Sequence, residues 1–296
     1  MSVLVDKSTR VIVQGLTGRA GTFYAHLAVR YGSEYVGGVR PGKGGSTHIG
    51  LPVFDTVAEA KAATGANASL VMVPAHKAAD AMVEAIHAGI GVIVCVTERV
   101  PVLDMVRVKA ALEGTDSVLI GPNSQGILTP EQCKIGVMST VDAKPGAVGI
   151  VSRSASLTSE VVALIAAAKM GQSTTIGIGG DPIHGLGFTQ SLKLFRDDPE
   201  TEAVVLIGEI GGTEEEDAAD YLSSVDYGKP VIALVVGRHA PRDKRMGHAG
   251  TLSVMGALSV DEKSARLASA GVHVVATADD VAPKLAEVMA MPAEAR

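Results

Sequence analysis

The chain lacks tryptophan, holds few aromatic residues and has only two cysteines, Cys95 and Cys133, among its 296 residues. Two thiols cannot form the disulfide framework of a secreted scaffold, so a cytoplasmic setting is expected. Hydrophobic residues make up 47% of the chain, yet no apolar run reaches the roughly 20 residues of a membrane span. A net charge of −6 and 3% aromatics give neither a basic surface nor stacking platforms. These absences argue against nucleic acid and membrane partners.

Short runs rich in Val and Ile alternate with Ala-rich amphipathic stretches, which is typical of βαβ units and parallel sheets. The first half of the chain predicts strands at 10–14, 35–39, 69–73, 91–96 and 117–120. Helices are expected to begin at Thr22, Thr56, Ala75 and Val102. After a turn-rich segment at 121–146, further strands are predicted at 148–151, 174–178, 203–207, 230–236 and 272–275. We therefore predict two α/β domains, residues 1–122 and 123–296.

The first predicted strand runs into a glycine-rich turn with Gly15, Gly18 and Gly21 in the pattern Gly-x-x-Gly-x-x-Gly. Such a turn lets backbone amides meet a diphosphate at a helix N-terminus. An NAD site would place an acid about 20 residues on, at the end of the second strand. Arg40 and Lys43 stand in that region instead. They suit a phosphorylated ribose, as in NADP or coenzyme A, and the alternative is a solvated loop.

In the second domain, the strand at 148–151 leads into Ser152-Arg-Ser-Ala-Ser-Leu-Thr-Ser-Glu160. Hydroxyls and free amides at a helix start favour phosphate or carboxylate, although ordinary capping by Ser154 explains the same pattern. Ser154 as a hydrolase nucleophile is disfavoured because the Gly-x-Ser-x-Gly elbow is missing. Glu209 follows the strand at 203–207 and could fix the tautomer of an imidazole.

Other segments carry less information about a site. Residues 214–216 are three glutamates that we interpret as first-turn complements to a helix dipole. The turn at 179–185 holds no set of metal ligands, so no metal site is expected, and no segment has the pattern of a complete ATP site.

One histidine, His248, lies between Gly247 and Gly250 and directly after Arg242, Lys244 and Arg245. Glycine lets a bulky anion approach the ring, and the cations attract it. A neutral imidazole can then act as a nucleophile toward phosphorus. The alternative is an incidental histidine in a surface loop, since the chain has eight histidines.

Six motifs in order over essentially the whole chain resemble the α subunit of succinyl-CoA synthetase, the nucleotide-diphosphate-forming succinate–CoA ligase. They are Pro41-Gly-Lys-Gly-Gly45, Gly121-Pro-Asn123, Ser152-Arg-Ser154, Gly177-Ile-Gly-Gly-Asp-Pro182, Ile207-Gly-Glu-Ile-Gly-Gly212 and Lys244-Arg-Met-Gly-His-Ala-Gly250.

The resemblance implies a Rossmann-like CoA-binding domain followed by a flavodoxin-like ligase domain. It implies that His248 is a phosphohistidine oriented by Glu209, that the phosphoryl group passes to a carboxylic acid, and that coenzyme A attacks the acyl phosphate. A β subunit with an ATP-grasp domain would supply ATP or GTP with Mg²⁺, in an αβ or α2β2 assembly. The implied coenzyme A ligands are Thr17, Gly18, Arg19, Ala20, Gly21, Lys43, Val96, Thr97 and Glu98.

The chain departs from the family pattern around the acid and phosphate positions. Ser124 replaces the usual Cys, Gln125 a Pro, and Ser159 a Tyr associated with the acid. The acid is therefore open between succinate and malate or another short dicarboxylate. A CoA-binding subunit without turnover and an NADP oxidoreductase are the competing functions. The candidate substrate and phosphate residues are Asn123, Ser124, Ser154, Ala155, Ser156 and Ser159.

Overall fold

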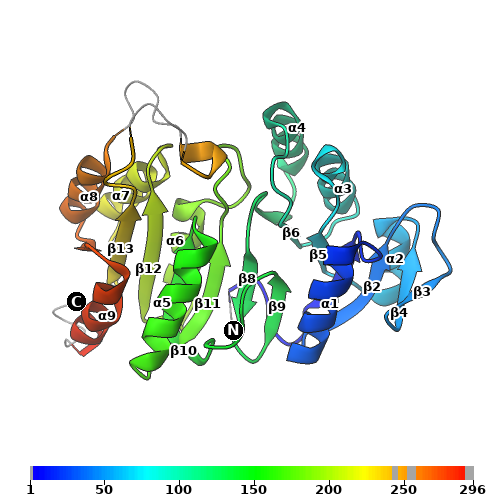
Figure 1. Cartoon of the computed structure of the whole chain (residues 1–296), viewed down its shortest axis with the longest axis horizontal. Helices are drawn as coiled ribbons and strands as arrows, with labels where there is room; N and C mark the ends of the chain where they lie inside the picture. The colour runs from blue at the N-terminus through cyan, green and yellow to red at the C-terminus, as the bar shows by residue number, and fades with distance from the viewer. Residues whose placement is uncertain (1–2, 242–245, 252–257, 291–296) are drawn as a thin grey trace. The chain divides into compact units, whose positions relative to one another are not determined.

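A computed structural model describes residues 3–241, 246–251 and 258–290 (Figure 1). The chain divides into two compact units. The N-terminal unit comprises Leu4–Met138 and Ile183–Leu186, and the C-terminal unit comprises Met1–Val3, Ser139–Pro182 and Gly187–Arg296. The division after Met138 differs from the expected boundary after residue 122.

The N-terminal unit is built on a sheet whose strand order is β3-β4-β2-β1-β5-β6-β7. Apart from the short antiparallel β3, the strands run parallel in the order 3-2-1-4-5-6 of a Rossmann fold. Gln14 pairs with Val39 on one side and Val71 on the other, so the ends of β1, β2 and β5 lie level. The strands are β1 (Arg10–Gln14), β2 (Glu34–Val39), β3 (Thr47–His48), β4 (Leu51–Phe54), β5 (Ala68–Val71), β6 (Val92–Cys95) and β7 (Val118–Ile120).

Helices α2 (Val57–Thr64), α3 (Ala75–His87) and α4 (Val102–Leu112) form one packed layer over this sheet. Ile12, Val71, Met82 and Ile93 lie fully buried between this layer and the sheet. Helix α1 (Arg19–Tyr31) contacts β1 and β2 and ends at Gly32, whose φ of 101° suits a left-handed C-cap.

The expected turn-rich segment at 121–146 contains an antiparallel hairpin of β8 (Gly126–Thr129) and β9 (Cys133–Gly136). The hairpin contacts α1 and β6. Tyr35 donates a hydrogen bond to the carbonyl oxygen of Lys134, and the Lys134 N–H donates to Ser33 Oγ. These bonds explain why residues 123–138 belong to the N-terminal unit. The expectation of a turn region here is corrected accordingly.

In the C-terminal unit, parallel strands follow the order β14-β13-β12-β10-β11. Counted along the chain, this is the 2-1-3-4-5 order of a flavodoxin-like sheet, so the predicted fold class is confirmed. The strands are β10 (Pro145–Ser152), β11 (Gln172–Gly177), β12 (Ala203–Glu209), β13 (Val231–Val236) and β14 (His273–Val275).

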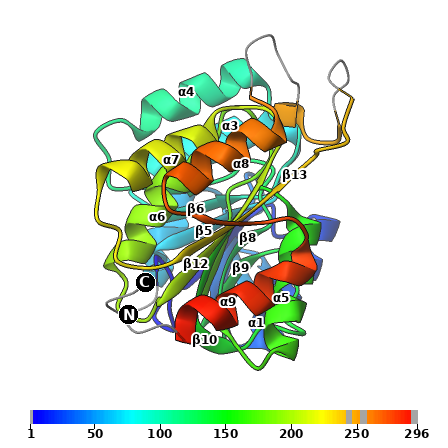
Figure 2. The same ribbon diagram turned by 90° about the vertical axis from the view of Figure 1, so that its left-hand side faces the viewer.

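Helices cover both faces of this second sheet, as Figure 2 shows. Helices α5 (Ala155–Ala167) and α9 (Val281–Ala290) pack together on one face, and α6 (Phe188–Asp197), α7 (Glu214–Ser224) and α8 (Val260–Ser269) form a row on the other. Parallel strands covered on both faces are buried along their length, and every residue of β12 is buried, including Glu209 at its end.

The predicted strands all exist, with ends within a few residues of the expected ones. Helices α3 and α4 begin at Ala75 and Val102 as predicted, whereas α1 begins at Arg19, before the expected Thr22. The short β3 and β4 were not predicted. No helix within the described ranges is long and apolar enough to cross a membrane.

Replacement of Gly38 by Ala should destabilise the N-terminal unit. An added Cβ would lie 2.4 Å from Leu16, which is fully buried, so the side chain must move. We expect a loss of about 1–3 kcal/mol in the free energy of unfolding, measured by urea denaturation with circular dichroism. Gly91→Ala in the same unit is the control, because its Cβ would meet only Asn67 at an ordinary 3.5 Å. Equal stability of the two variants would contradict the packing argument.

Candidate active site

Two neighbouring strand ends of the C-terminal unit carry the first charged groups of the site. Strand β10 ends at Ser152 and β12 ends at Glu209, with Ser152 paired to Ile207. Arg153 follows β10 directly, and its N–H donates to the carbonyl oxygen of Ile207. These are the first and third strands of the sheet, where the strand order reverses and α/β proteins bind ligands. Both Arg153 and Glu209 are buried.

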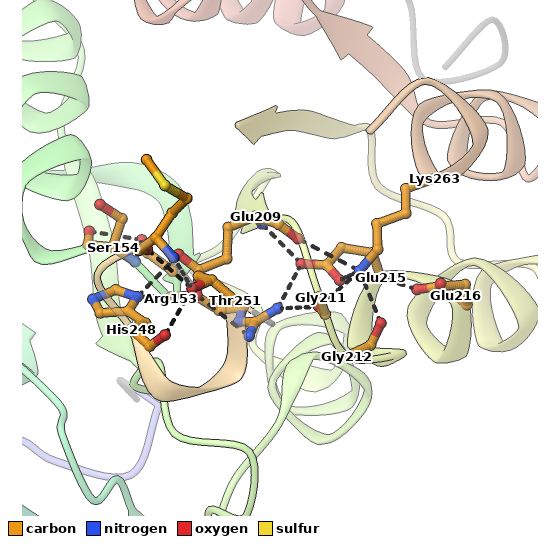
Figure 3. A network of polar contacts seen from close by, with 12 residues as sticks. Arg153, Ser154, Glu209, Gly211, Gly212, Glu215, Glu216, His248, Thr251 and Lys263 are labelled. Carbon is orange, nitrogen blue, oxygen red and sulfur yellow. Dashed lines mark hydrogen bonds and ion pairs between the residues drawn. The ribbon is translucent and has the colours of Figure 1, made fainter. Parts of the chain in front are cut away.

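His248 comes from the segment after β13 and meets Glu209 at this edge (Figure 3). Its Nδ1 lies 3.0 Å from Oε1 and 2.9 Å from Oε2 of Glu209. Thr251 holds the turn, because its hydroxyl lies 2.7 Å from the carbonyl oxygen of His248 and accepts a hydrogen bond from the N–H of Met246. Within the described part of the chain, no group bonds to Nε2 of His248, so the predicted pair exists with one ring nitrogen open.

Glycines allow the backbone to lie this close to the imidazole. A Cβ on Gly180 would stand 2.2 Å from Cγ of His248, and one on Gly211 would stand 2.2 Å from the carbonyl oxygen of Gly250. The N–H of Gly250 donates to the carbonyl oxygen of Gly180 at 3.0 Å. Three loops therefore pack backbone against backbone around the ring. Gly180 belongs to the motif at 177–182, but the sequence assigned it no role at the site.

The carboxylate of Glu209 sets the protonation of His248. Its hydrogen bond raises the pKa of the imidazole, and burial and the nearby Arg153 oppose that rise. Asp181 adds a weaker effect that also raises the pKa. In the neutral ring the proton stays on Nδ1, because the carboxylate can only accept a hydrogen bond. The lone pair of Nε2 is then available to an electrophile.

Behind Glu209 lies a buried ion-pair cluster that the sequence did not reveal. Arg153 Nη2 lies 3.3 Å from Glu209 Oε1, and Arg153 Nη1 lies 3.3 Å from Glu215 Oε1. Lys263 Nζ lies 2.5 Å from Glu215 Oε2 and 3.4 Å from Glu216 Oε2. The interpretation of residues 214–216 as a helix first turn is confirmed, but Glu215 and Glu216 are buried partners of cations.

The N-terminus of α5 lies directly after Arg153. Ser154 is the N-cap and accepts a hydrogen bond from the N–H of Leu157, so ordinary capping accounts for its hydroxyl. Ala155, Ser156 and Ser159 are exposed on the first turns of this helix. The hydroxyl of Ser159 donates a hydrogen bond to the carbonyl oxygen of Ala155. An anion-binding role for Ser154, Ala155, Ser156 and Ser159 stays a prediction.

In the N-terminal unit, the glycine turn after β1 is shaped by close contacts. Gly15 has φ of 97°, and a Cβ on Gly21 would stand 2.2 Å from the carbonyl oxygen of Gly15. Gly18 is the N-cap of α1 and offers no side-chain cap, so amides of the first turn stay open to a ligand. The turn fits the diphosphate cradle that the sequence predicts.

Arg19 is part of this turn, and Arg40 contacts it. Arg40 Nη1 donates to Thr17 Oγ1, which brings the end of β2 to the turn. Lys43 is exposed, and its N–H donates to Asp55 Oδ1, so Asp55 holds the loop that presents the lysine. Hydrogen bonds from backbone N–H groups, that of Gly44 first, lower the pKa of Asp55. A cavity of about 450 Å³ adjoins the turn and is lined by Thr17, Arg19, Thr22, Phe23, His26, Leu27 and Arg30.

Two other predicted segments meet at the end of β6. The N–H of Asn123 donates to the carbonyl oxygen of Thr97, and Thr97 donates to the carbonyl oxygen of Val73. Val96 and Glu98 flank Thr97, and Ser124 is buried and accepts from the N–H of Gly126. Asn123 and Ser124 thus belong to the N-terminal unit, and Ser154 and His248 to the C-terminal unit. The predicted cations Arg242, Lys244 and Arg245 lie outside the described residues.

Each of the two units contains a match to a known protein family. A family described as CoA binding domain matches residues 6–99, and a family described as CoA-ligase matches residues 151–273. These matches cover the glycine turn in the first unit and the Glu209–His248 pair in the second.

Curated relatives match over nearly the whole chain. The α subunit of ADP-forming succinate–CoA ligase from Staphylococcus aureus is 47% identical over 287 residues, 97% of this chain and 95% of that protein. The corresponding subunit of Aquifex aeolicus is 47% identical over 291 residues, 98% of this chain and 95% of that protein.

Solved structures share the fold at lower identity. ATP citrate lyase from Methanothrix soehngenii, in complex with citrate and coenzyme A, has a TM-score of 0.86 at 22% identity, over 98% of this chain and 52% of that one. Dinucleotide-forming acetyl-coenzyme A synthetase 1 from Ca. Korarchaeum cryptofilum, in complex with phosphate and ADP, has a TM-score of 0.73 at 18% identity, over 93% and 59%. The chain spans little more than half the length of these structures. The 47% sequence identity to the curated relatives, over nearly the whole chain, establishes the family. The chain belongs to the family of succinate–CoA ligase α subunits.

Proposed function

We propose that this chain is the α subunit of a nucleotide-diphosphate-forming acid–CoA ligase that carries a phosphoryl group on Nε2 of His248. The observation that supports this most is the hydrogen bond of Nδ1 to Glu209, which leaves Nε2 as the nucleophilic nitrogen. A positioned carboxylate behind an imidazole is the arrangement that activates a nucleophile.

The reaction divides one difficult step into three easier ones. Nε2 attacks the γ-phosphorus of a nucleoside triphosphate, the bond to the β–γ bridging oxygen breaks, and the nucleoside diphosphate leaves. A carboxylate oxygen of the acid then attacks phosphorus, which gives an acyl phosphate and returns the electron pair to Nε2. The thiolate of coenzyme A attacks the acyl carbon and expels phosphate. Glu209 stabilises the imidazolium charge that exists while Nε2 is bonded to phosphorus.

The N-terminal unit supplies the coenzyme A site in this proposal. The open amides after Gly18 and the cations Arg40 and Lys43 suit the diphosphate and the 3′-phosphate of coenzyme A. Thr17, Arg19, Ala20 and Gly21 form the turn, with Val96, Thr97 and Glu98 at the neighbouring strand end.

A partner subunit completes the enzyme. We infer a β subunit with an ATP-grasp domain that binds ATP or GTP with Mg²⁺, in an αβ or α2β2 assembly. The relatives are named as α subunits, which supports a partner of this kind. Cys95 and Cys133 are both buried, and two cysteines make no disulfide framework, which suits the reducing cytoplasm where we place the enzyme.

The acid is a short dicarboxylate, and two candidates stand. Succinate is favoured by the named relatives. Malate or a bulkier relative is favoured by the exposed, small side chains of Ala155, Ser156 and Ser159 along the start of α5. A CoA-binding subunit without turnover is the second class of function, and the intact Glu209–His248 pair argues against it.

Replacing His248 with Asn should abolish phosphoenzyme formation. Asparagine has no nucleophilic ring nitrogen, whereas coenzyme A binds through the other unit. The complex with the native partner is incubated with Mg-ATP, and the His248 peptide is analysed by mass spectrometry, with coenzyme A affinity measured by calorimetry. The matched control is His239→Asn, an exposed histidine nine positions away by sequence number. Equal phosphorylation of His248→Asn and wild type would refute the proposal.

Glu209→Gln should move the pH profile of phosphohistidine formation to lower pH. In the wild type the raised pKa of His248 keeps the ring protonated to a higher pH, so the nucleophilic form appears only as pH rises through that pKa. Loss of the carboxylate removes the main cause of the rise. We also expect the limiting rate at high pH to fall about 10²-fold, since an amide can hold the wrong tautomer. Quench-flow rates between pH 5.5 and 9 test both effects, and an unchanged midpoint would contradict them.

Ser159→Tyr should narrow the range of acids. A phenol at this exposed position fills space beside the start of α5, so malate and bulkier acids should discharge the phosphoenzyme more slowly than succinate does. Discharge of labelled phosphohistidine is followed with coenzyme A and each acid in turn. If the ratio of the succinate to malate rates stays at the wild-type value, Ser159 does not contribute to acid selection.

A further inference from the structure

Glu215 occupies the centre of the buried cluster behind the His248 pair (Figure 3). It lies in the first turn of α7, and its side chain is fully buried. Its Oε1 accepts a hydrogen bond from the N–H of Glu209 at 3.0 Å and lies 3.3 Å from Arg153 Nη1. Its Oε2 lies 2.5 Å from Lys263 Nζ. One carboxylate therefore touches both the backbone and the cation that hold Glu209.

Arg153 is shared between two carboxylates. Its Nη2 faces Glu209, and its Nη1 faces Glu215 and donates to the carbonyl oxygen of Gly211 at 3.0 Å. The side chain is only 4% exposed, so water screens these interactions little. The guanidinium is therefore held between the two carboxylates, with one terminal nitrogen facing each of them.

Lys263 anchors the other end of the cluster. It is fully buried on α8, the helix that follows the His248 segment in the chain, and it donates to the carbonyl oxygens of Gly211 and Gly212 at 3.0 Å each. Through Glu215, Lys263 connects α8 to Glu209, the last residue of β12, which holds the imidazole. A fully buried lysine is rare unless paired, and Glu215 is its nearest acid.

We propose that Glu215 is a positioning residue for phosphoryl transfer, which acts on His248 through Arg153 and Glu209. The proposal rests on the proposed function of His248 and extends it to residues that touch neither the ring nor a substrate.

The sign of the effect follows from the charges. His248 faces Glu209 from β12, Arg153 from the end of β10 and Asp181 from the loop after β11. Without the charge of Glu215, Arg153 turns to Glu209 alone and neutralises it more fully. The imidazolium then loses part of its partner, so the protonation midpoint of His248 moves to lower pH.

Glu216 offers a matched control in the same helix. It is the next residue, is also buried and contacts the same Lys263 at 3.4 Å, but it has no recorded contact with Arg153 or Glu209. Glu216→Gln therefore makes the same chemical change beside the same lysine without reaching the His248 pair.

Two measurements on Glu215→Gln and Glu216→Gln test the proposal. The full chain labelled with ¹⁵N-histidine gives the titration midpoint of His248 by NMR, assigned with His248→Asn. The complex with the native partner and Mg-ATP gives the limiting rate of phosphohistidine formation at high pH. We expect Glu215→Gln to lower the midpoint and to slow the limiting rate about tenfold, and Glu216→Gln to change neither. Equal midpoints and rates in both variants would overturn the proposal.

The titration needs no turnover, so it separates this proposal from the assignment of His248 as phosphohistidine. Absence of phosphate on wild-type His248 would refute that assignment, and the midpoints would still decide the role of Glu215. If Glu215→Gln does not fold, Arg153→Lys replaces it, because a lysine keeps the positive charge but cannot bridge two carboxylates. We expect the same loss of rate, and a wild-type rate in that variant would count against Glu215.

Discussion

The hydrogen bond between Glu209 and Nδ1 of His248 joins two elements that the chain separates by 39 positions. This hydrogen bond sets the orientation of the imidazole and its tautomer, and it leaves Nε2 as the open nitrogen. The other features of the site keep Glu209 and His248 in position to form it. Glu209 is placed by the end of a central parallel strand, whose hydrogen bonds on both sides allow little movement. The described residues between β13 and His248, 237–241 and 246–247, form no strand or helix, so the hydrogen bonds to Glu209 and Thr251 position the histidine.

Close backbone packing and buried charge support this bond in different ways. Gly180, Gly211 and Gly250 let three loops approach within distances that any side chain would prevent. The ion-pair cluster then orients the buried side chains, because each carboxylate has a cation partner and each cation has more than one acceptor. A buried cluster of this kind is costly to disrupt one residue at a time, since the remaining charge would have no partner. The site is therefore preorganised before any substrate arrives.

The sequence predicted the architecture because Val- and Ile-rich strands leave a local signal that needs no knowledge of distant contacts. An acid at a strand end and a histidine among glycines each have a local pattern, which drew attention to Glu209 and His248 separately. Their pairing was implied by the resemblance to the succinyl-CoA synthetase α subunit. The sequence did not predict β8 and β9, which have four residues each and lie beside Gln125, Pro130 and Gln132 in a segment with a turn-like composition. It also missed Lys263 and the burial of Glu215, because on an amphipathic helix such residues look like a solvated face. Lys263 and Glu215 are partners that lie 48 positions apart in the sequence, so only folding brings them together.

The charge balance of the cluster fits the proposed chemistry. Arg153 and Lys263 bring two positive charges, and Glu209, Glu215 and Glu216 bring three negative ones, so the ion-paired set has a formal charge of −1 with a neutral imidazole. A positive ring on His248 brings that sum to zero. In the proposed phosphohistidine, the bond from Nε2 to phosphorus makes the ring positive while Nδ1 keeps its proton and donates it in a hydrogen bond to Glu209. The third carboxylate of the set therefore favours a positive ring on His248, as the proposed phosphohistidine requires.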